Sequence, residues 1–365
     1  MKIVVLLGGT SPEREVSLRS GGGVGRALLA RGHRVTLLDT GTGRALRTPE
    51  EAVALGSRRA ASRAAAPGTA AAERWKATLL RTRRGIDAVF VALHGGDGED
   101  GTVQGWLARA GIPFTGSGPL SSGLAMDKAW AKKIFRQVGI PTPGWLELRI
   151  PARARPGARV PEILESDFAA LGGFPLVVKP NSVGSSVGIT IVRARDSLRR
   201  AILTAARYDP RVLLEEFIPG RELTVTVLEG RAFPVVEVIP AGEFYDYKRK
   251  YTAGASRYEV PASVSSALTD SLQELSVRAF REFGCGGAAR VDYRLRGDGA
   301  AFCLEINTVP GLTELSLVPM AARAAGLSYE RLVEEMVEGA RAGMGAGAKR
   351  GPATVAPAAV AGISR

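Results

Sequence analysis

AARVDYRLRGDGAAFCLEINTVPGLTELSLVP, residues 288–319, is the stretch that decides how the rest of the chain is interpreted. Two short runs, 290–296 and 301–307, flank Asp298-Gly299, a dipeptide typical of a two-residue hairpin turn. Such a turn fixes the register of the two strands, so the side chains that face each other can be predicted.

The predicted register brings four polar side chains to one face of the hairpin. Asp292 lies opposite Glu305, and Arg290 lies opposite Asn307, because side chains alternate along a strand. Two facing carboxylates repel unless a cation lies between them, and carboxylate and amide oxygens suit Mg²⁺, which also binds substrate phosphates. Arg290 beside that ion would contact anionic oxygens. A solvated acidic face is the alternative for one acid pair, and the shared register of four residues favours a metal site.

Composition limits the class of protein. The 365 residues suffice for two or three domains with a sizeable core. The net charge of +13 is concentrated in segment 41–85, which has ten Lys or Arg against three Glu and only Trp75 as an aromatic residue, so nucleic-acid binding is disfavoured. Two cysteines, Cys285 and Cys303, imply no disulfide framework and fit a reducing cytoplasm. The apolar run 3–7 is too short for a signal peptide or membrane span.

The N-terminal third predicts a doubly wound α/β layer. We expect a strand at 2–7, a helix at 13–31 and a strand at 33–39. In a layer of this kind, ligands bind beyond the carboxyl ends of the strands. Glycine disfavours a helix, and this helix has four, at positions 21, 22, 23 and 25. The close approach of another element or of a ligand would explain them. Glu15 is a candidate to bind a substrate ammonium, although a first-turn Glu also favours the helix dipole. A third strand, 87–93, ends at His94 and the Gly-rich acidic loop 95–101, again where a site is expected.

The middle of the chain predicts nucleotide contacts. Helix 122–138 carries Lys128, and strand 174–180 ends with Lys179; both could reach a phosphate, although solvated lysines are common on helices. The loop 181–188, rich in Gly and Ser, joins strand to strand as a flap or a plain hairpin turn would, whereas a P-loop opens a helix. Strand 212–216 runs into a hinge that suits adenine, with Glu222 near the ribose hydroxyls. Loop 242–262, rich in Tyr, is expected to be a lid, 329–341 a helix, and the tail 345–365 disordered.

Eight motifs, in chain order, together resemble the D-alanine:D-alanine ligase family of the ATP-grasp superfamily. They are HGGDGEDG, TGSG, MDK, VKPNSVGSSVG, LEEF, FYDYKRKY, RVDY and LEINTVPGLTELSLVP, and the resemblance runs from Met1 to about Ala340. It implies an α/β (α+β overall) chain with an ATP-grasp fold after an N-terminal doubly wound α/β (pre-ATP-grasp) domain. The implied units are 1–122 with a basic insert at 41–85, a central subdomain with the flap at 123–212, a C-terminal subdomain with lid and metal site at 213–344, and the tail.

The same resemblance assigns residues to the site. The metal ligands would be Asp292, Glu305 and Asn307, with Glu305 between two Mg²⁺ ions, for which Mn²⁺ would be a substitute. The ATP-binding set would be Lys128, Lys179, Ser186, Glu215, Glu216, Phe217, Ile218, Glu222 and Lys250. The substrate-binding set would be Glu15, His94, Arg290, Gly311, Ser316 and Leu317, and the catalytic set Glu15, Ser185, Tyr251, Arg290 and His94.

The implied activity is the ATP-dependent joining of two D-alanine molecules through an acyl phosphate, for peptidoglycan precursors, by a cytoplasmic homodimer that binds neither nucleic acid nor membrane. Lys250-Tyr251 resembles the dipeptide-forming members rather than those that make a D-alanine-D-lactate ester. Three alternatives are a ligase with another D-amino acid or D-lactate as acceptor, a nucleotide-dependent dehydrogenase, and a nucleic-acid-binding protein. The dehydrogenase lacks the spaced glycines after Gly8-Gly9, and Asp39 alone is a weak signal for ribose binding.

Overall fold

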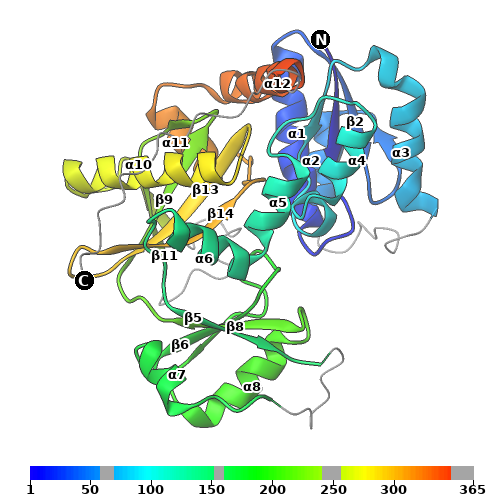
Figure 1. Ribbon diagram of the computed structural model, residues 1–365. Coiled ribbons are helices and arrows are strands. Elements are labelled where there is room, and N and C mark those ends of the chain that lie inside the picture. Colours follow the sequence, from blue (N-terminus) through cyan, green and yellow to red (C-terminus); the bar gives the residue numbers. More distant parts are fainter. Residues whose placement is uncertain (58–69, 152–159, 241–255, 347–365) are drawn as a thin grey trace, which may run out of the picture.

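Three β-sheets and the helices packed on them form the described part of the chain (Figure 1). The computed structural model describes residues 1–57, 70–151, 160–240 and 256–346. The lid residues Lys250 and Tyr251 and most of the predicted tail lie outside these ranges. Within them, no helix combines the length and apolar composition of a membrane span.

The first sheet is the predicted N-terminal α/β layer, with strand order β3-β2-β1-β4. Its strands are β1 (Lys2–Leu7), β2 (Arg34–Asp39), β3 (Arg44–Leu46) and β4 (Ala88–Val91). β1 pairs in parallel with β2 and β4, so their carboxyl ends lie at one edge. After β4 come η2 (Gly96–Gly98) and α4 (Thr102–Arg109). The predicted strand-helix-strand opening is therefore confirmed.

The glycines of α1 (Arg14–Ala30) are explained by close packing. A Cβ at Gly21 would lie 2.5 Å from the side chain of Leu7, and one at Gly22 would lie 2.7 Å from Val53. Segment 41–85 is thus more than a surface insert. It supplies the antiparallel edge strand β3, α2 (Pro49–Ser57) against α1, α3 (Ala70–Thr82) and η1 (Arg83–Gly85).

The second sheet is antiparallel and carries the flap. Its order is β5-β8-β6-β7, from β5 (Trp145–Arg149), β6 (Leu176–Pro180), β7 (Thr190–Val192) and β8 (Arg211–Glu216). The helices of this unit are α7 (Glu165–Ala170) and α8 (Arg195–Ala205). β6 pairs with β7, so loop 181–188 joins strand to strand as predicted. The predicted boundary between 212 and 213 falls inside β8.

The third sheet contains the central hairpin. Its order is β12-β11-β9-β13-β14, with β10 beside β9. The strands are β9 (Arg221–Leu228), β10 (Arg231–Ala232), β11 (Val236–Pro240), β12 (Ser256–Glu259), β13 (Ala288–Leu295) and β14 (Ala301–Asn307). α10 (Ser266–Glu282) contributes Leu272 and Phe280 to its core. The helix predicted at 122–138 is two helices, α5 (Pro119–Met126) and α6 (Lys128–Gln137), because the Asp127 side chain caps α6 by accepting from the Trp130 N–H. Ala131 and Phe135 of α6 pack in this core, not against the second sheet.

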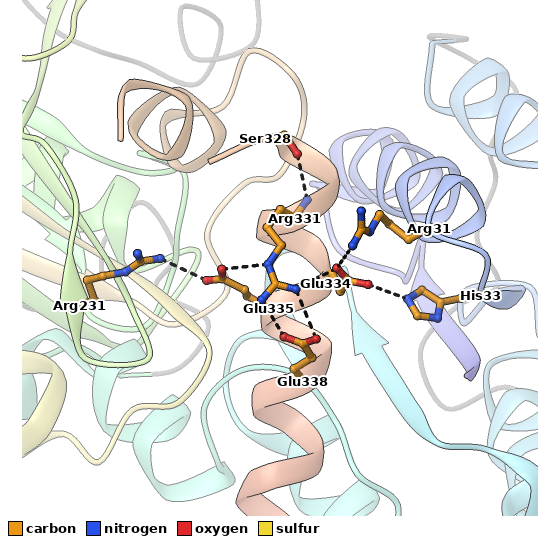
Figure 2. Close-up of polar contacts among 8 residues, drawn as sticks. All are labelled: Arg31, His33, Arg231, Ser328, Arg331, Glu334, Glu335 and Glu338. Atoms are coloured by element: carbon orange, nitrogen blue, oxygen red, sulfur yellow. Dashed lines mark hydrogen bonds and ion pairs between the residues drawn. The ribbon is translucent and has the colours of Figure 1, made fainter. Parts of the chain in front are cut away.

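The last two helices, α11 (Leu317–Ala324) and α12 (Tyr329–Ala346), return to the first sheet. Leu332, Val333 and Val337 of α12 share one hydrophobic core with Ile3 and Val5 of β1. Figure 2 shows polar contacts from α12 to two other parts of the chain. Glu334 lies 2.6 Å from Arg31 at the end of α1, and Glu335 lies 3.2 Å from Arg231 of β10. The C-terminal helix therefore ties the first sheet to the third.

Candidate active site

The β13–β14 hairpin has the predicted register at its polar end. Asp292 pairs with Glu305, and Arg290 pairs with Asn307. The turn, however, is one residue longer than predicted, because the Arg296 N–H donates to the carbonyl of Ala300. A β-bulge after Asp292 absorbs this extra residue, so Tyr293 pairs with Cys303. Two deviations from an ideal hairpin cancel, and the polar face is preserved.

The acidic face of the hairpin is held by hydrogen bonds. The Arg290 guanidinium donates to both carboxylate oxygens of Asp292, at 2.8 and 2.7 Å, and Thr224 Oγ1 donates to Oδ1 at 2.7 Å. Val291 and Ile306 point the other way into the core, as predicted. Lys128 Nζ lies 3.4 Å from Glu305 Oε2 and donates to the carbonyl of Val183 in the flap.

Two carboxylates and one amide oxygen fit the preferences of Mg²⁺. Among the described residues, no group of three His, Cys, Asp or Glu side chains could hold an ion. The side chains of Asp292, Glu305 and Asn307 therefore do not complete the coordination shell of an ion. This suits Mg²⁺, whose remaining ligands are water and substrate phosphates.

At the carboxyl end of β14 is the loop-side pocket, which lies between the first sheet and the third. Of the predicted substrate and catalytic residues, those lining it are His94, Ser185, Arg290, Gly311, Ser316 and Leu317. His94 is buried and its Nε2 lies 3.0 Å from Ser20 Oγ, while its Nδ1 lies 3.8 Å from Glu99. The pocket thus combines an imidazole, a hydroxyl and a guanidinium around a small space.

Three glutamates line this pocket, Glu13, Glu99 and Glu305, and Glu15, which was expected to bind the substrate ammonium, is not among them. Glu13 lines the loop-side pocket, and its carboxylate accepts a hydrogen bond from the Ser185 hydroxyl of the flap. Glu15 does not line it, because it already belongs to the first turn of α1, where its backbone carbonyl faces Gly56. Loop 8–13 directly follows β1, and that position at a strand's carboxyl end was the signal for Glu13.

Nearer the turn of the hairpin is the hinge-side pocket, between the second and third sheets. It brings together the predicted ATP-binding residues of the described chain: Lys128, Lys179, Ser186, Glu215, Glu216, Phe217, Ile218 and Glu222. Asp292 and Glu305 also line it, so Lys128 and Glu305 belong to both pockets. Ser185 and Ser186 have φ angles of 53° and 58°, which bends the flap between the two pockets.

A buried charged triad closes the far end of the hinge-side pocket. Glu215 is 2% exposed, and its two oxygens lie 2.7 Å from Lys179 Nζ and 2.6 Å from Lys132 Nζ. Burial alone would raise the pKa of Glu215, and the two ammonium groups outweigh it and lower the pKa. Burial lowers the pKa of Lys132 to about 8, against the opposing effect of Glu215. The spacing of the helix lysines gave no signal that Lys132 is buried.

Known proteins share this arrangement over most of the chain. The D-ala D-ala ligase N-terminus model matches residues 2–117, and the D-ala D-ala ligase C-terminus model matches 134–338. A D-alanine–D-alanine ligase of Syntrophotalea carbinolica is 43% identical over 93% of this chain and 96% of its own length. One of Synechococcus sp. (strain JA-3-3Ab) is 42% identical over 93% of this chain and 94% of its own. The crystal structure of D-alanine–D-alanine ligase from Bacillus anthracis complexed with ATP has a TM-score of 0.73 and 31% identity, covering 94% of this chain and 99% of that one.

The two sheets that enclose the hinge-side pocket, with the flap between them, define an ATP-grasp fold. Within that class, the chain belongs to the D-alanine–D-alanine ligase family. The fold and family predicted from the eight motifs are confirmed.

Proposed function

We propose that this chain uses ATP to join two D-alanine molecules into D-alanyl-D-alanine. The observation that carries the proposal is the shared wall of the two pockets: Lys128 and Glu305 line both, so a phosphoryl donor in one pocket would meet a carboxylate in the other. The family membership supports the same reaction.

The reaction proceeds in two balanced steps. A carboxylate oxygen of the first D-alanine attacks the γ-phosphorus of ATP, and the bond to ADP breaks. The amine of the second D-alanine then attacks the acyl carbon, phosphate leaves, and the amine loses a proton. Negative charge is spread over the oxygens of the transferred phosphoryl group, and Lys128, Lys179 and Arg290 line the two pockets between which it passes.

Glu13 is assigned the ammonium of the first D-alanine. Its carboxylate is the acidic group of the loop-side pocket that the flap hydroxyl of Ser185 already orients. His94 and Arg290 also line this pocket and suit the carboxylate that becomes phosphorylated. Gly311, Ser316 and Leu317 line the same pocket, and we assign them to the second D-alanine.

ATP is assigned to the hinge-side pocket. Phe217 and Ile218 would cover the adenine, Glu215 would face its amino group, and Glu222 would bind ribose hydroxyls. Asp292, Glu305 and Asn307 would hold Mg²⁺, which neutralises the phosphate charge when bound. Two ions rather than one, and replacement by Mn²⁺, are predictions from the family resemblance.

An acceptor panel tests this proposal. The purified protein is incubated with ATP, Mg²⁺ and D-alanine, and phosphate release and dipeptide are both quantified, with D-serine, D-lactate and L-alanine as competing acceptors. We expect one phosphate per D-alanyl-D-alanine and no product from L-alanine. An ester product exceeding dipeptide at neutral pH would contradict the choice of acceptor, which depends on Lys250-Tyr251.

We infer that the protein works in the cytoplasm, where ATP is available and its two free cysteines stay reduced. A homodimer is predicted from the family resemblance, and light scattering during size-exclusion chromatography tests it. No nucleic-acid or membrane partner is proposed.

A further inference from the structure

Two neighbouring lysines on α6 have opposite environments. Lys133 is exposed and its ammonium lies 4.3 Å from the ring centroid of Trp130 at the surface. Lys132 has no exposed surface. A buried ammonium loses its hydration, so the surrounding groups must replace it, and a lysine is placed there only at a cost in stability.

Three oxygen atoms surround the buried ammonium of Lys132. Its Nζ lies 2.6 Å from Glu215 Oε2 and donates to Thr142 Oγ1 at 2.9 Å and to the carbonyl of Pro143 at 3.1 Å. Two N–H groups of the ammonium are used by these hydrogen bonds, and the Glu215 carboxylate balances its charge. Lys132 does not line the hinge-side pocket, so it reaches a nucleotide only through another residue.

That residue is Glu215, which lines the pocket. Lys179 binds one oxygen of Glu215 and Lys132 binds the other, so the triad carries one net positive charge. Without Lys132, Lys179 and Glu215 would neutralise each other, and the positive charge available to phosphates would fall. The Glu215 carboxylate would also lose the contact that fixes its second oxygen.

We propose that Lys132 is a positioning residue for nucleotide selection: it holds the Glu215 carboxylate ionised and in place as the acceptor for the amino group of adenine. This inference rests on the proposed assignment of ATP to the hinge-side pocket. A carboxylate there accepts from the amino group of adenine and repels the carbonyl oxygen that guanine presents at the same position. Lys132 thereby contributes to the choice of ATP over GTP without touching either.

The charged and titratable groups that face Lys132 define its pH response. They are Glu215 on β8, Lys179 on β6, and Cys303 on β14, whose buried thiol has a pKa raised well above its usual value and stays neutral. Arg136 of α6 shares the Trp145 ring with Lys132, at 5.5 Å for each. Since burial lowers the pKa of Lys132 to about 8, raising the pH from 7 to 9.5 removes its charge. Affinity for ATP should fall across this interval.

The test measures binding of a non-hydrolysable ATP analogue and its GTP counterpart by titration calorimetry, without D-alanine, from pH 7 to 9.5. We expect wild type and Lys133→Met to weaken together about tenfold above pH 8, and Lys132→Arg, which keeps the charge, to stay level. Lys132→Met should bind the ATP analogue at least about tenfold more weakly at pH 7 and lose preference over GTP, with the KM for D-alanine within about twofold of wild type.

A level profile in wild type overturns the inference, and this readout does not require any variant to fold. Lys132→Met that folds and binds like Lys133→Met also overturns it. The double variant Lys132→Met with Glu215→Gln, which keeps the single net positive charge of the triad on Lys179 but removes the carboxylate, should show the same loss of preference for the ATP analogue. If wild type forms dipeptide but shows no pH response, this inference alone fails; if wild type binds no ATP analogue, the proposed function fails.

Discussion

Asp292 lies directly opposite Glu305, while the next residue, Tyr293, lies opposite Cys303, so Leu304 is the one residue of β14 left without a partner. The bulge at Leu304 puts two consecutive side chains, Leu304 and Glu305, on the hinge-side pocket. An apolar side chain and a carboxylate thus line the pocket from one strand. Without the bulge, the longer turn would move either Asp292 or Glu305 to the core face.

Glu13 and Glu15 give a matched pair of variants, because Glu13 lines the loop-side pocket and Glu15 does not. Glu13→Gln removes a charge from the loop-side pocket and should raise the KM for the first D-alanine about 10- to 100-fold, because a charge-assisted hydrogen bond is lost. Glu15→Gln should leave this constant within about twofold. Initial rates as a function of D-alanine at saturating ATP give both values. The assignment fails if Glu15→Gln has the larger effect.

A buried ion pair supports the loop that carries Glu13. Arg14 donates to both oxygens of Asp39, at 2.7 and 2.6 Å, and to the carbonyl of Gly9 at 2.9 Å. Asp39→Asn leaves the buried Arg14 uncompensated and should destabilise the protein by about 3–5 kcal/mol. Urea unfolding followed by circular dichroism measures the change. Arg26→Gln, at an exposed pair 3.9 Å from Glu314, is the control and should cost less than about 1 kcal/mol.

Asp127 should contribute to the free energy of unfolding, and this contribution should be lost at acid pH. Burial alone would raise the pKa of Asp127, but hydrogen bonds from Arg211 and the Trp130 N–H outweigh it, so the pKa is lowered. A carboxylate with a lowered pKa stabilises the fold above its unfolded pKa, and this contribution is lost as the pH falls through the folded pKa. Asn also caps helices, so Asp127→Asn mainly removes the ion pair. Wild type should be more stable than Asp127→Asn by about 1 kcal/mol at pH 6. The difference should shrink as the pH falls below 3.8, the ordinary pKa of the carboxyl, and vanish only below the lower pKa of the folded state. A difference that is constant with pH would contradict this account.

Both cysteines should be inert in the folded protein. Burial raises the pKa of Cys285 to about 11 and that of Cys303 well above its usual value. At pH 8 only about one Cys285 thiol in a thousand is ionised. A thiol-disulfide reagent at pH 8 should therefore label neither cysteine within minutes and both after addition of guanidinium. Rapid labelling of the native protein, with loss of activity, would give one of them a role that this account lacks.

The pairing of the polar residues on the hairpin could be predicted from sequence because it depends on local contacts. The register of Asp292 with Glu305 follows from a short turn, and the hinge and flap follow strands with clear apolar patterns. The predicted length of the turn was wrong. The bulge that compensates for the longer turn lies inside β14, and it does not change the alternation of side chains at the two ends of the strand.

What sequence alone missed depends on contacts between distant segments. In the sequence, Lys132 looks like a solvated helix lysine, and only the contact with Glu215 of β8 shows its role. Gly22 looks like a helix breaker, and only the packing of α2 against α1 explains it. Glu13 and Glu15 are two residues apart, and only the position at which α1 begins decides which of them faces the flap.

The measurement that tests the central claim most directly is Mg²⁺-dependent turnover of Glu305→Gln beside Asp298→Asn. Both residues belong to the hairpin, but Glu305 lines both pockets, whereas Asp298 lies exposed in the turn and pairs with Arg296. Glu305→Gln should lose at least about 100-fold in kcat with an unchanged melting temperature, because it removes charge that balances the metal and phosphates. Asp298→Asn should keep wild-type turnover. Near-wild-type turnover in Glu305→Gln would contradict the claim that this hairpin holds the magnesium-nucleotide centre.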